Sequence, residues 1–311
     1  MNQQRTSLSH QLEISGNNVQ YDTEVKKVLS NKIILAWILK YSTEEFKEAT
    51  LEEIKEAIEG TPEISTIPVY PGKTAEMITG MSNEDKVPNE SEVRYDIRFI
   101  AFTPNKERIK LIVNIEAQKS YHPGYDLVTR AIYYCARMLS AQADTEFVIP
   151  EYDGLKKVYS IWICMNTPKY AQNTITRYKI KQEKVFGNFS GTARYDLLSV
   201  IMLCLGTAKL PTENPLLGML SVLLSPEINV EEKEIRLQTN YGLEHSIEIK
   251  EGLQTMCNLS YSILEKGIEQ GKAELIRNCL KKLGSCEQVA ELLGVSLEEV
   301  TIVAKKMKAD S

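Results

Sequence analysis

The segment from Tyr95 to Gln118 constrains the fold more than any other part of the chain. Two runs rich in Ile, Val, Phe and Leu flank the polar stretch from Thr103 to Arg108, a composition typical of a β-hairpin. If the hairpin is centred on Lys106, Asp96 pairs with Glu116. Directly opposed residues in a hairpin have Cβ atoms roughly 4.5–5.5 Å apart. The hairpin is therefore predicted to hold two carboxylates close enough to repel each other.

Alternation along the two runs supports this register. The odd-numbered positions in 97–101 and 111–117 are all apolar, and the polar side chains lie at even-numbered positions. Because successive side chains of a strand point to opposite faces, one face is predicted to be core. The other face is predicted to carry Asp96, Glu116 and Gln118 together near the open end. An ordinary half-exposed hairpin with a charged outer face is the alternative.

The remaining patterns predict an α/β protein. Apolar residues recur at helical spacing from Asp22 to Lys40, and a second helix is predicted from Leu51 to Glu59. A further helix is predicted from Pro123 to about Ala143, and the apolar run Val158–Met165 is typical of a buried parallel strand. This order of helix, strand, hairpin, helix and strand indicates a mixed central sheet flanked by helices.

Three regions are predicted along the chain. Residues 1–20 are expected to form a flexible N-terminus, and residues 21–240 are expected to form the sheet-containing domain. Residues 241–311 are expected to form a helical C-terminal region, because helical spacing continues from Leu243 to the end.

Part of the C-terminal region has the pattern of a helix-turn-helix. Ser285 and Ser296 can each cap a helix, and Gly294 lies at the turn between them. A recognition helix meets DNA with its first residues, and here those include Glu298 and Glu299, which repel phosphate. Helical packing or oligomerisation is therefore the favoured interpretation of this segment.

Composition excludes several classes of function. The chain has 311 residues, of which 43% are hydrophobic and 25% charged, as is typical of soluble globular proteins. Its net charge of −5 does not indicate general affinity for polyanions, so nucleic acid would have to meet a local patch. The six cysteines are scattered and the histidines number three, which disfavours zinc clusters and histidine-based triads. We therefore expect a cytoplasmic protein with no membrane and no small-molecule cofactor.

Two facing carboxylates are what metal-assisted phosphodiester cleavage requires. Mg²⁺ takes oxygen ligands while keeping several of its waters, and it acidifies an attacking water. Asp96 and Glu116 are the predicted ligands of Mg²⁺ or Mn²⁺, with the backbone carbonyl of Ala117 as a further oxygen. Gln118 is predicted to orient the attacking water or a phosphate oxygen.

Three segments of the chain carry a resemblance to a known family: ITGMSNEDKVPNESEVRYDIRF, LIVNIEAQKSYHPGYDLVTRAIYYCARMLSAQ and VYSIWICMN. Asp96, followed by Glu116-Ala117-Gln118 on the next strand, resembles the PD-(D/E)xK nuclease family transposases, which belong to the Rpn-like recombination-promoting nucleases. The resemblance runs from about residue 22 to 166. It implies a restriction-endonuclease-like core, Mg²⁺-dependent DNA cleavage and a link to transposition or recombination. DNA is the implied partner, and a homo-oligomer is left open.

The chain departs from this family's signature at position 118, where glutamine replaces lysine. Glutamine cannot place a positive charge beside the scissile phosphate. The residues predicted to be catalytic are Asp96, Glu116 and Gln118, and the alternative is a catalytically weak or inactive nuclease-fold module that binds DNA or protein. Many such nucleases add an acid from the first helix. The candidates for that acid are Asp22, Glu24 and Glu45.

Two basic features are candidates for DNA contact. Arg130, Tyr133 and Arg137 recur at helical spacing and could contact phosphate, with a solvated face as the alternative. The stretch from Lys169 to Lys184 holds five basic residues against one acid. It suits either a DNA track or an edge strand protected by lysines.

Overall fold

The computed structural model describes residues 7–64, 84–85, 93–104, 110–210, 212–243 and 247–309. The chain divides into two compact units. One comprises Val19–Cys257, and the other joins Met1–Asn18 with Asn258–Ser311. The domain boundaries predicted at residues 20 and 240 stay predictions, and the compact units divide at other residues.

The helices and strands follow one another in an α/β order. In chain order they are α1 (Ser7–Leu29), α2 (Lys32–Ser42), α3 (Leu51–Ala57), β1 (Glu63–Ile64), β2 (Glu84–Asp85), β3 (Val93–Arg94), β4 (Ile97–Phe102), β5 (Lys110–Ser120), α4 (Leu127–Ser140), the short 3-10 helix η1 (Tyr152–Gly154), β6 (Lys157–Asn166), β7 (Thr174–Lys179), β8 (Leu198–Cys204), α5 (Pro215–Leu224), α6 (Val230–Tyr241), α7 (Ile247–Leu283), α8 (Cys286–Leu293) and α9 (Leu297–Ala309).

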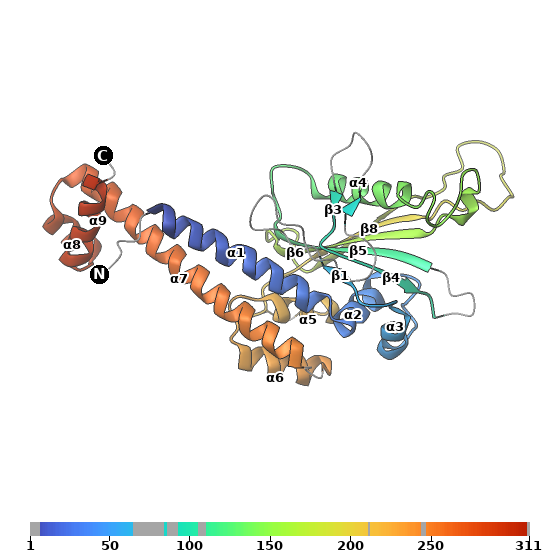
Figure 1. The fold of residues 1–311 in the computed structure, drawn as a ribbon, viewed down its shortest axis with the longest axis horizontal. Helices are drawn as coiled ribbons and strands as arrows, with labels where there is room; N and C mark the ends of the chain where they lie inside the picture. Colours follow the sequence, from blue (N-terminus) through green and yellow to red (C-terminus); the bar gives the residue numbers. More distant parts are fainter. Residues whose placement is uncertain are drawn as a thin grey trace. The chain divides into compact units, whose positions relative to one another are not determined.

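A mixed sheet forms the centre of the unit Val19–Cys257. Within the described ranges it has six strands in the order β1-β4-β5-β6-β8-β7. Strands β1, β4 and β5 are antiparallel neighbours, β6 is parallel to β5 and β8, and β7 is antiparallel to β8. Helix α4 lies along one face of the sheet, and α2 and α5 lie on the other (Figure 1). The predicted α/β class with a mixed sheet flanked by helices is confirmed.

The hairpin predicted from the sequence is formed by β4 and β5. Arg98 pairs with Asn114 and Phe102 pairs with Lys110, which are the pairs of a hairpin centred on Lys106. The same register continued by one residue places Asp96, which directly precedes β4, opposite Glu116. The centre of the predicted turn falls at 105–109, outside the described residues.

Both faces of β5 are buried, although the alternation predicted one core face and one polar face. Ile112 and Asn114 on the even-numbered face are as inaccessible as Val113 and Ile115 on the other. The reason is α4, whose apolar stripe forms a core with the even-numbered residues of the sheet. This core includes Ile112, Ala131, Cys135, Val158, Trp162 and Val200. The half-exposed hairpin, kept as the alternative, is therefore not what the chain forms.

The helix predicted from Asp22 to Lys40 is two helices, α1 and α2. Asn31 lies between them and caps α2, its side chain accepting a hydrogen bond from the backbone N–H of Ile33 at 3.0 Å. Asparagine is among the preferred N-cap residues because its oxygen satisfies a free amide of the first turn. Helix α1 begins at Ser7, within the segment that we predicted to be flexible. Among the described helices, none has the length and apolarity needed to cross a membrane.

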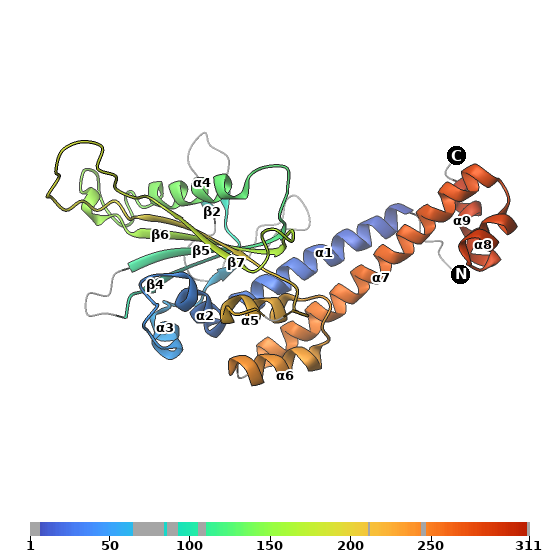
Figure 2. The same ribbon diagram turned by 180° about the vertical axis from the view of Figure 1, so that it is seen from behind.

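Figure 2 shows the sheet from behind, with the long β7–β8 connection extending beyond the end where β6 begins. The strand predicted at Val158–Met165 is β6, and its parallel pairing with β5 is confirmed. The basic stretch from Lys169 contains β7, which is the last strand in the sheet order and so forms its edge.

The smaller unit contains the helix pair α8 and α9. Ser285 caps α8, Ser296 caps the start of α9, and Gly294 between them adopts a left-handed conformation with φ of 62°. Helices α8 and α9 pack with the C-terminal part of α7 through an apolar cluster that includes Ile276 of α7, Val289, Val300 and Val303. The acidic start of α9 is held within the unit, because Glu299 forms a 2.7 Å ion pair with Lys272.

Candidate functional site

The two predicted metal ligands lie together at one end of the sheet, where the interior strand β4 begins and the interior strand β5 approaches its end. The backbone N–H of Asp96 donates to Glu116 Oε1 at 3.1 Å. The backbone N–H of Ala117 donates to Asp96 Oδ2 at 3.0 Å. Each carboxylate thus accepts a hydrogen bond from the backbone of the other strand. The hairpin register therefore holds both carboxylates at the same place with fixed orientations.

Helix α1 brings a lysine and a third acid to this end of the sheet. Lys26 Nζ lies 2.8 Å from Asp96 Oδ1 and 2.8 Å from Asp22 Oδ2. The side chain of Lys26 is only 3% exposed. Sequence reasoning included Asp22 among its candidates but missed Lys26. The signal that was present is the i,i+4 spacing of Asp22 and Lys26, which places an acid and a base side by side on a helix.

The other two candidate acids lie elsewhere. Glu24 forms a 2.6 Å ion pair with Lys27. Glu45 lies 2.9 Å from Lys157 Nζ and accepts a hydrogen bond from the hydroxyl of Tyr159. Lys157 begins β6, and because β6 is parallel to β5, this end of the sheet is opposite to the end that carries Glu116. Of the three acids, Asp22 is the one linked to the hairpin carboxylates.

Burial dominates the electrostatics of the carboxylate pair. It raises the pKa of Glu116 well above its usual range, and the charge of Asp96 adds to the rise. It also raises the pKa of Asp96, although the charge and hydrogen bond of Lys26 oppose this. Burial by itself would lower the pKa of Lys26, but Asp96 and Asp22 raise it above its usual value. A cation placed against such a pair favours the ionised carboxylates and so gains affinity from them.

Gln118 lies on the strand as predicted but makes a local contact. Its side-chain Nε2 donates to the backbone oxygen of Ser120 at 2.7 Å. On the neighbouring strand its partner in register is Cys164. The next residue, Lys119, points to helix α1, where its Nζ lies 5.6 Å from the ring centroid of Tyr21. This contact uses one N–H of the Gln118 amide, and the second N–H and the carbonyl oxygen are the groups left to contact a water.

Helix α4 places Arg130 next to the Glu116 side of the pair. Its guanidinium donates to the hydroxyls of Tyr134 and Tyr125, with the Tyr125 bond at 2.6 Å. It also lies 5.3 Å from the ring centroid of Trp162, the residue in register with Glu116 on β6. The charge of Arg130 favours the ionised form of Glu116.

The other two members of the predicted phosphate stripe have different surroundings. Tyr133 is 48% exposed, whereas Arg137 is 4% exposed and belongs to the buried residues of α4. Arg130, Tyr133 and Arg137 therefore do not form one continuous surface. Arg130 is the member of this stripe that the structure brings to the carboxylate pair.

The basic stretch around β7 is partly neutralised. Arg177 and Lys179 both pair with Glu44, at 2.5 Å and 3.3 Å. The stretch thus has the position of an edge strand with guarding cations, the interpretation that we kept beside a DNA track.

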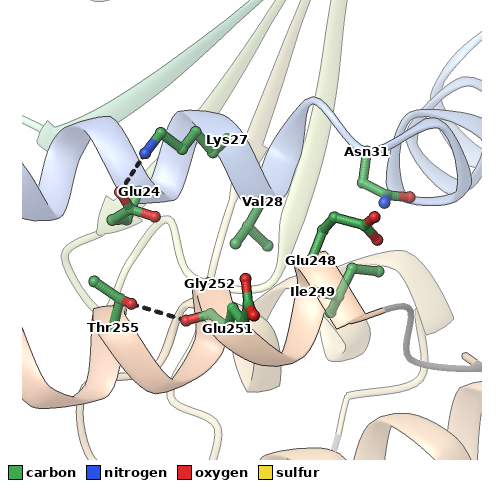
Figure 3. A pocket seen from close by; sticks show the side chains of 9 residues that line it. All are labelled: Glu24, Lys27, Val28, Asn31, Glu248, Ile249, Glu251, Gly252 and Thr255. Atoms are coloured by element: carbon green, nitrogen blue, oxygen red, sulfur yellow. Dashed lines mark hydrogen bonds and ion pairs between the residues drawn. The ribbon is translucent and has the colours of Figure 1, made fainter.

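A pocket of about 270 Å³ lies apart from the carboxylate pair, between α1 and the first turns of α7 (Figure 3). It is lined by Glu24, Lys27, Val28, Asn31, Glu248, Ile249, Glu251, Gly252 and Thr255. In Figure 3 Lys27 reaches Glu24, and the hydroxyl of Thr255 donates to the backbone oxygen of Glu251 at 2.8 Å. The polar side chains of Lys27 and Thr255 thus have partners within the pocket wall.

Within the part of the chain that the structure describes, there is no group of three or more His, Cys, Asp or Glu side chains arranged to hold a metal ion. The hairpin supplies two such side chains, so a metal would also need backbone or substrate oxygens. Comparison with protein-family models, curated proteins and solved structures gave no match. The residues of the site are therefore the basis for proposing a function.

Proposed function

We propose that this chain is a metal-dependent DNA endonuclease of the PD-(D/E)xK type, which hydrolyses phosphodiester bonds in the cytoplasm and takes part in transposition or recombination. The observation that carries the proposal is the pair of Asp96 and Glu116, each fixed by a hydrogen bond from the other strand. Burial without a metal is unfavourable for two such acids, since it raises the pKa of both. A divalent cation would offset that cost.

The topology around the pair supports the proposal. Antiparallel strands β1, β4 and β5 are followed by α4, which crosses to the parallel strand β6. The acids lie at the start of β4 and near the end of β5, the places that the resemblance implies for a restriction-endonuclease-like core. Helix α1 precedes the strands and contributes Asp22, which suits an acid from the first helix.

Asp96, Glu116 and the backbone carbonyl of Ala117 would hold Mg²⁺ or Mn²⁺. When bound, the ion supplies Lewis acidity and an acidified water. The chain's own contribution is orientation, because Ala117 N–H fixes one oxygen of Asp96 and Asp96 N–H fixes one oxygen of Glu116. Arg130, beside Glu116, would meet a phosphate of the bound DNA.

The test is a plasmid-nicking assay with Mg²⁺ or Mn²⁺. Asp96→Asn and Glu116→Gln keep the shape of the side chains and remove their charge, so nicking should fall on the order of 10²–10³-fold. Glu48→Gln is the matched control, because Glu48 is 90% exposed and should nick like the wild type. Equal residual nicking by the wild type and both site variants would overturn the proposal.

One observation favours a second function, a catalytically weak or inactive module that binds DNA or protein. Gln118 carries no charge, and its side-chain N–H donates to the backbone oxygen of Ser120. On this alternative, the wild type slows the migration of a DNA fragment in a gel-shift assay. Plasmid nevertheless remains intact at any concentration of Mg²⁺ or Mn²⁺. Nicking that depends on Asp96 excludes it.

A further inference from the structure

We propose that Lys26 is a positioning residue of this site and supplies there the fixed positive charge that Gln118 cannot. The inference rests on the proposed endonuclease function and deepens it by assigning a residue outside the hairpin. Lys26 belongs to α1, and 70 residues separate it from Asp96 along the chain, so no motif of the hairpin contains it.

The ammonium group of Lys26 is held between two carboxylates. It lies 2.8 Å from one oxygen of Asp96 and 2.8 Å from one oxygen of Asp22. With its side chain only 3% exposed, the lysine has given up nearly all of its contact with water. A buried charge is retained only where it is paired, and removing one partner of such a group is strongly destabilising. The pairing therefore ties α1 firmly to the start of β4.

The contact with Lys26 also fixes the orientation of the Asp96 carboxylate. One carboxylate oxygen accepts from the ammonium of Lys26, and the other accepts from the backbone N–H of Ala117. Two donors on two different oxygens fix the plane of the carboxylate. Groups that orient a metal ligand in this way are needed for affinity or activity, and their loss typically costs 10–100-fold.

Of the neighbouring cations, Lys27 and Lys119 are engaged elsewhere, whereas Arg130 lies beside Glu116. Lys27 pairs with Glu24, and Lys119 lies over the ring of Tyr21. Arg130 is held by tyrosine hydroxyls on the α4 side, next to Glu116. Lys26 on one side and Arg130 on the other thus bracket the carboxylate pair with positive charge, as cleavage of a polyanion requires.

The experiment compares Lys26→Met, Lys26→Arg and the control Lys27→Met in the 311-residue chain. Plasmid nicking is measured at saturating Mn²⁺ over a range of DNA concentrations, so that kcat and KM separate, and a thermal melt accompanies each variant. We expect Lys26→Met to lower kcat by about 10–100-fold with little change in KM. Lys26→Arg should keep more of the activity than Lys26→Met, because it keeps the charge. Lys27→Met should behave like the wild type.

A double variant keeps the test valid if Lys26→Met melts early. Lys26→Met leaves the carboxylates of Asp22 and Asp96 without their cation. Adding Asp22→Asn removes the charge of one of them, so the double variant should recover much of the melting temperature but not kcat. Wild-type kcat in Lys26→Met, or a recovery of kcat that follows the melting temperature in the double variant, would overturn the inference alone. A wild type as inactive as Asp96→Asn would instead overturn the endonuclease proposal, and the inference with it.

Discussion

Replacing Glu116 by glutamine should stabilise the protein in the absence of divalent metal. Glu116 is 4% exposed, and burial together with the charge of Asp96 raises its pKa well above the usual range. In the ionised form it is therefore a source of instability. Glutamine has nearly the same shape, and its Oε1 can still accept the hydrogen bond from the backbone N–H of Asp96.

The size of the effect follows from linkage. Each unit by which the folded state raises a carboxyl pKa costs the ionised form about 1.4 kcal/mol. The lost attraction between Glu116 and Arg130 reduces the gain from the substitution. We expect Glu116→Gln to raise the free energy of unfolding by about 1–3 kcal/mol at pH 8–9. For a unit of this size, each kcal/mol corresponds to roughly 2–4 °C in melting temperature.

The sign of the pH dependence is opposite to that of a carboxylate in a stabilising ion pair. Because the folded pKa of Glu116 is raised, the folded state binds more protons than the unfolded state between the usual carboxyl pKa of 4.5 and the folded value. Wild-type stability therefore falls as the pH rises through that window. The glutamine does not titrate, so the advantage of Glu116→Gln should be small near pH 4.5 and grow with pH.

The assay is thermal unfolding followed by circular dichroism in EDTA, at intervals from pH 5 to pH 9, with Glu48→Gln as an exposed control. Addition of Mn²⁺ should then raise the melting temperature of the wild type and leave that of Glu116→Gln nearly unchanged. A variant that is less stable than the wild type across the range, or a difference that does not change with pH, would refute the reasoning.

Three further substitutions test packing, one beside the site and two along helix α7. Ser160→Ala removes the acceptor of a 2.8 Å hydrogen bond from the indole N–H of buried Trp162, and it should lower the free energy of unfolding in urea by about 1–3 kcal/mol. Gly252→Ala would place a Cβ 2.5 Å from a methyl of the buried Val28, so it should cost about 1–3 kcal/mol. Gly271→Ala on the same helix meets nothing within 4 Å and should instead add about 0.5–1 kcal/mol. Equal effects of the two glycine substitutions in a thermal melt would contradict the packing argument.

Local patterns in the sequence predicted much of the fold. The register of β4 and β5 follows from the two-residue alternation of a strand and from the position of the turn, and both can be read along the chain. The parallel strand β6 is a continuous apolar run. The second predicted helix is α3, and it begins with a capping box formed by Thr50 and Glu53. Each of these features depends on residues close together in the sequence.

Features that depend on how elements pack were predicted less well. The break between α1 and α2 was missed, because the apolar spacing continues through Asn31 and hides the cap. The even-numbered face of the hairpin is polar in part, yet α4 covers it and buries Glu116. The stripe of Arg130, Tyr133 and Arg137 has regular spacing, but only the packing of α4 decides that Arg137 is buried.

The amino-acid sequence by itself predicted that Asp96 and Glu116 face each other, because strand alternation and a turn centred on Lys106 together select this register. Only the tertiary structure decided what surrounds them. It buries the pair, which raises both pKa values, and it brings Lys26 and Asp22 to Asp96 from a helix distant in the sequence. The physical reason is that hydrogen-bond register is a local property of two strands. Burial and ion pairing depend instead on which helices pack against the sheet at the end that carries the carboxylates.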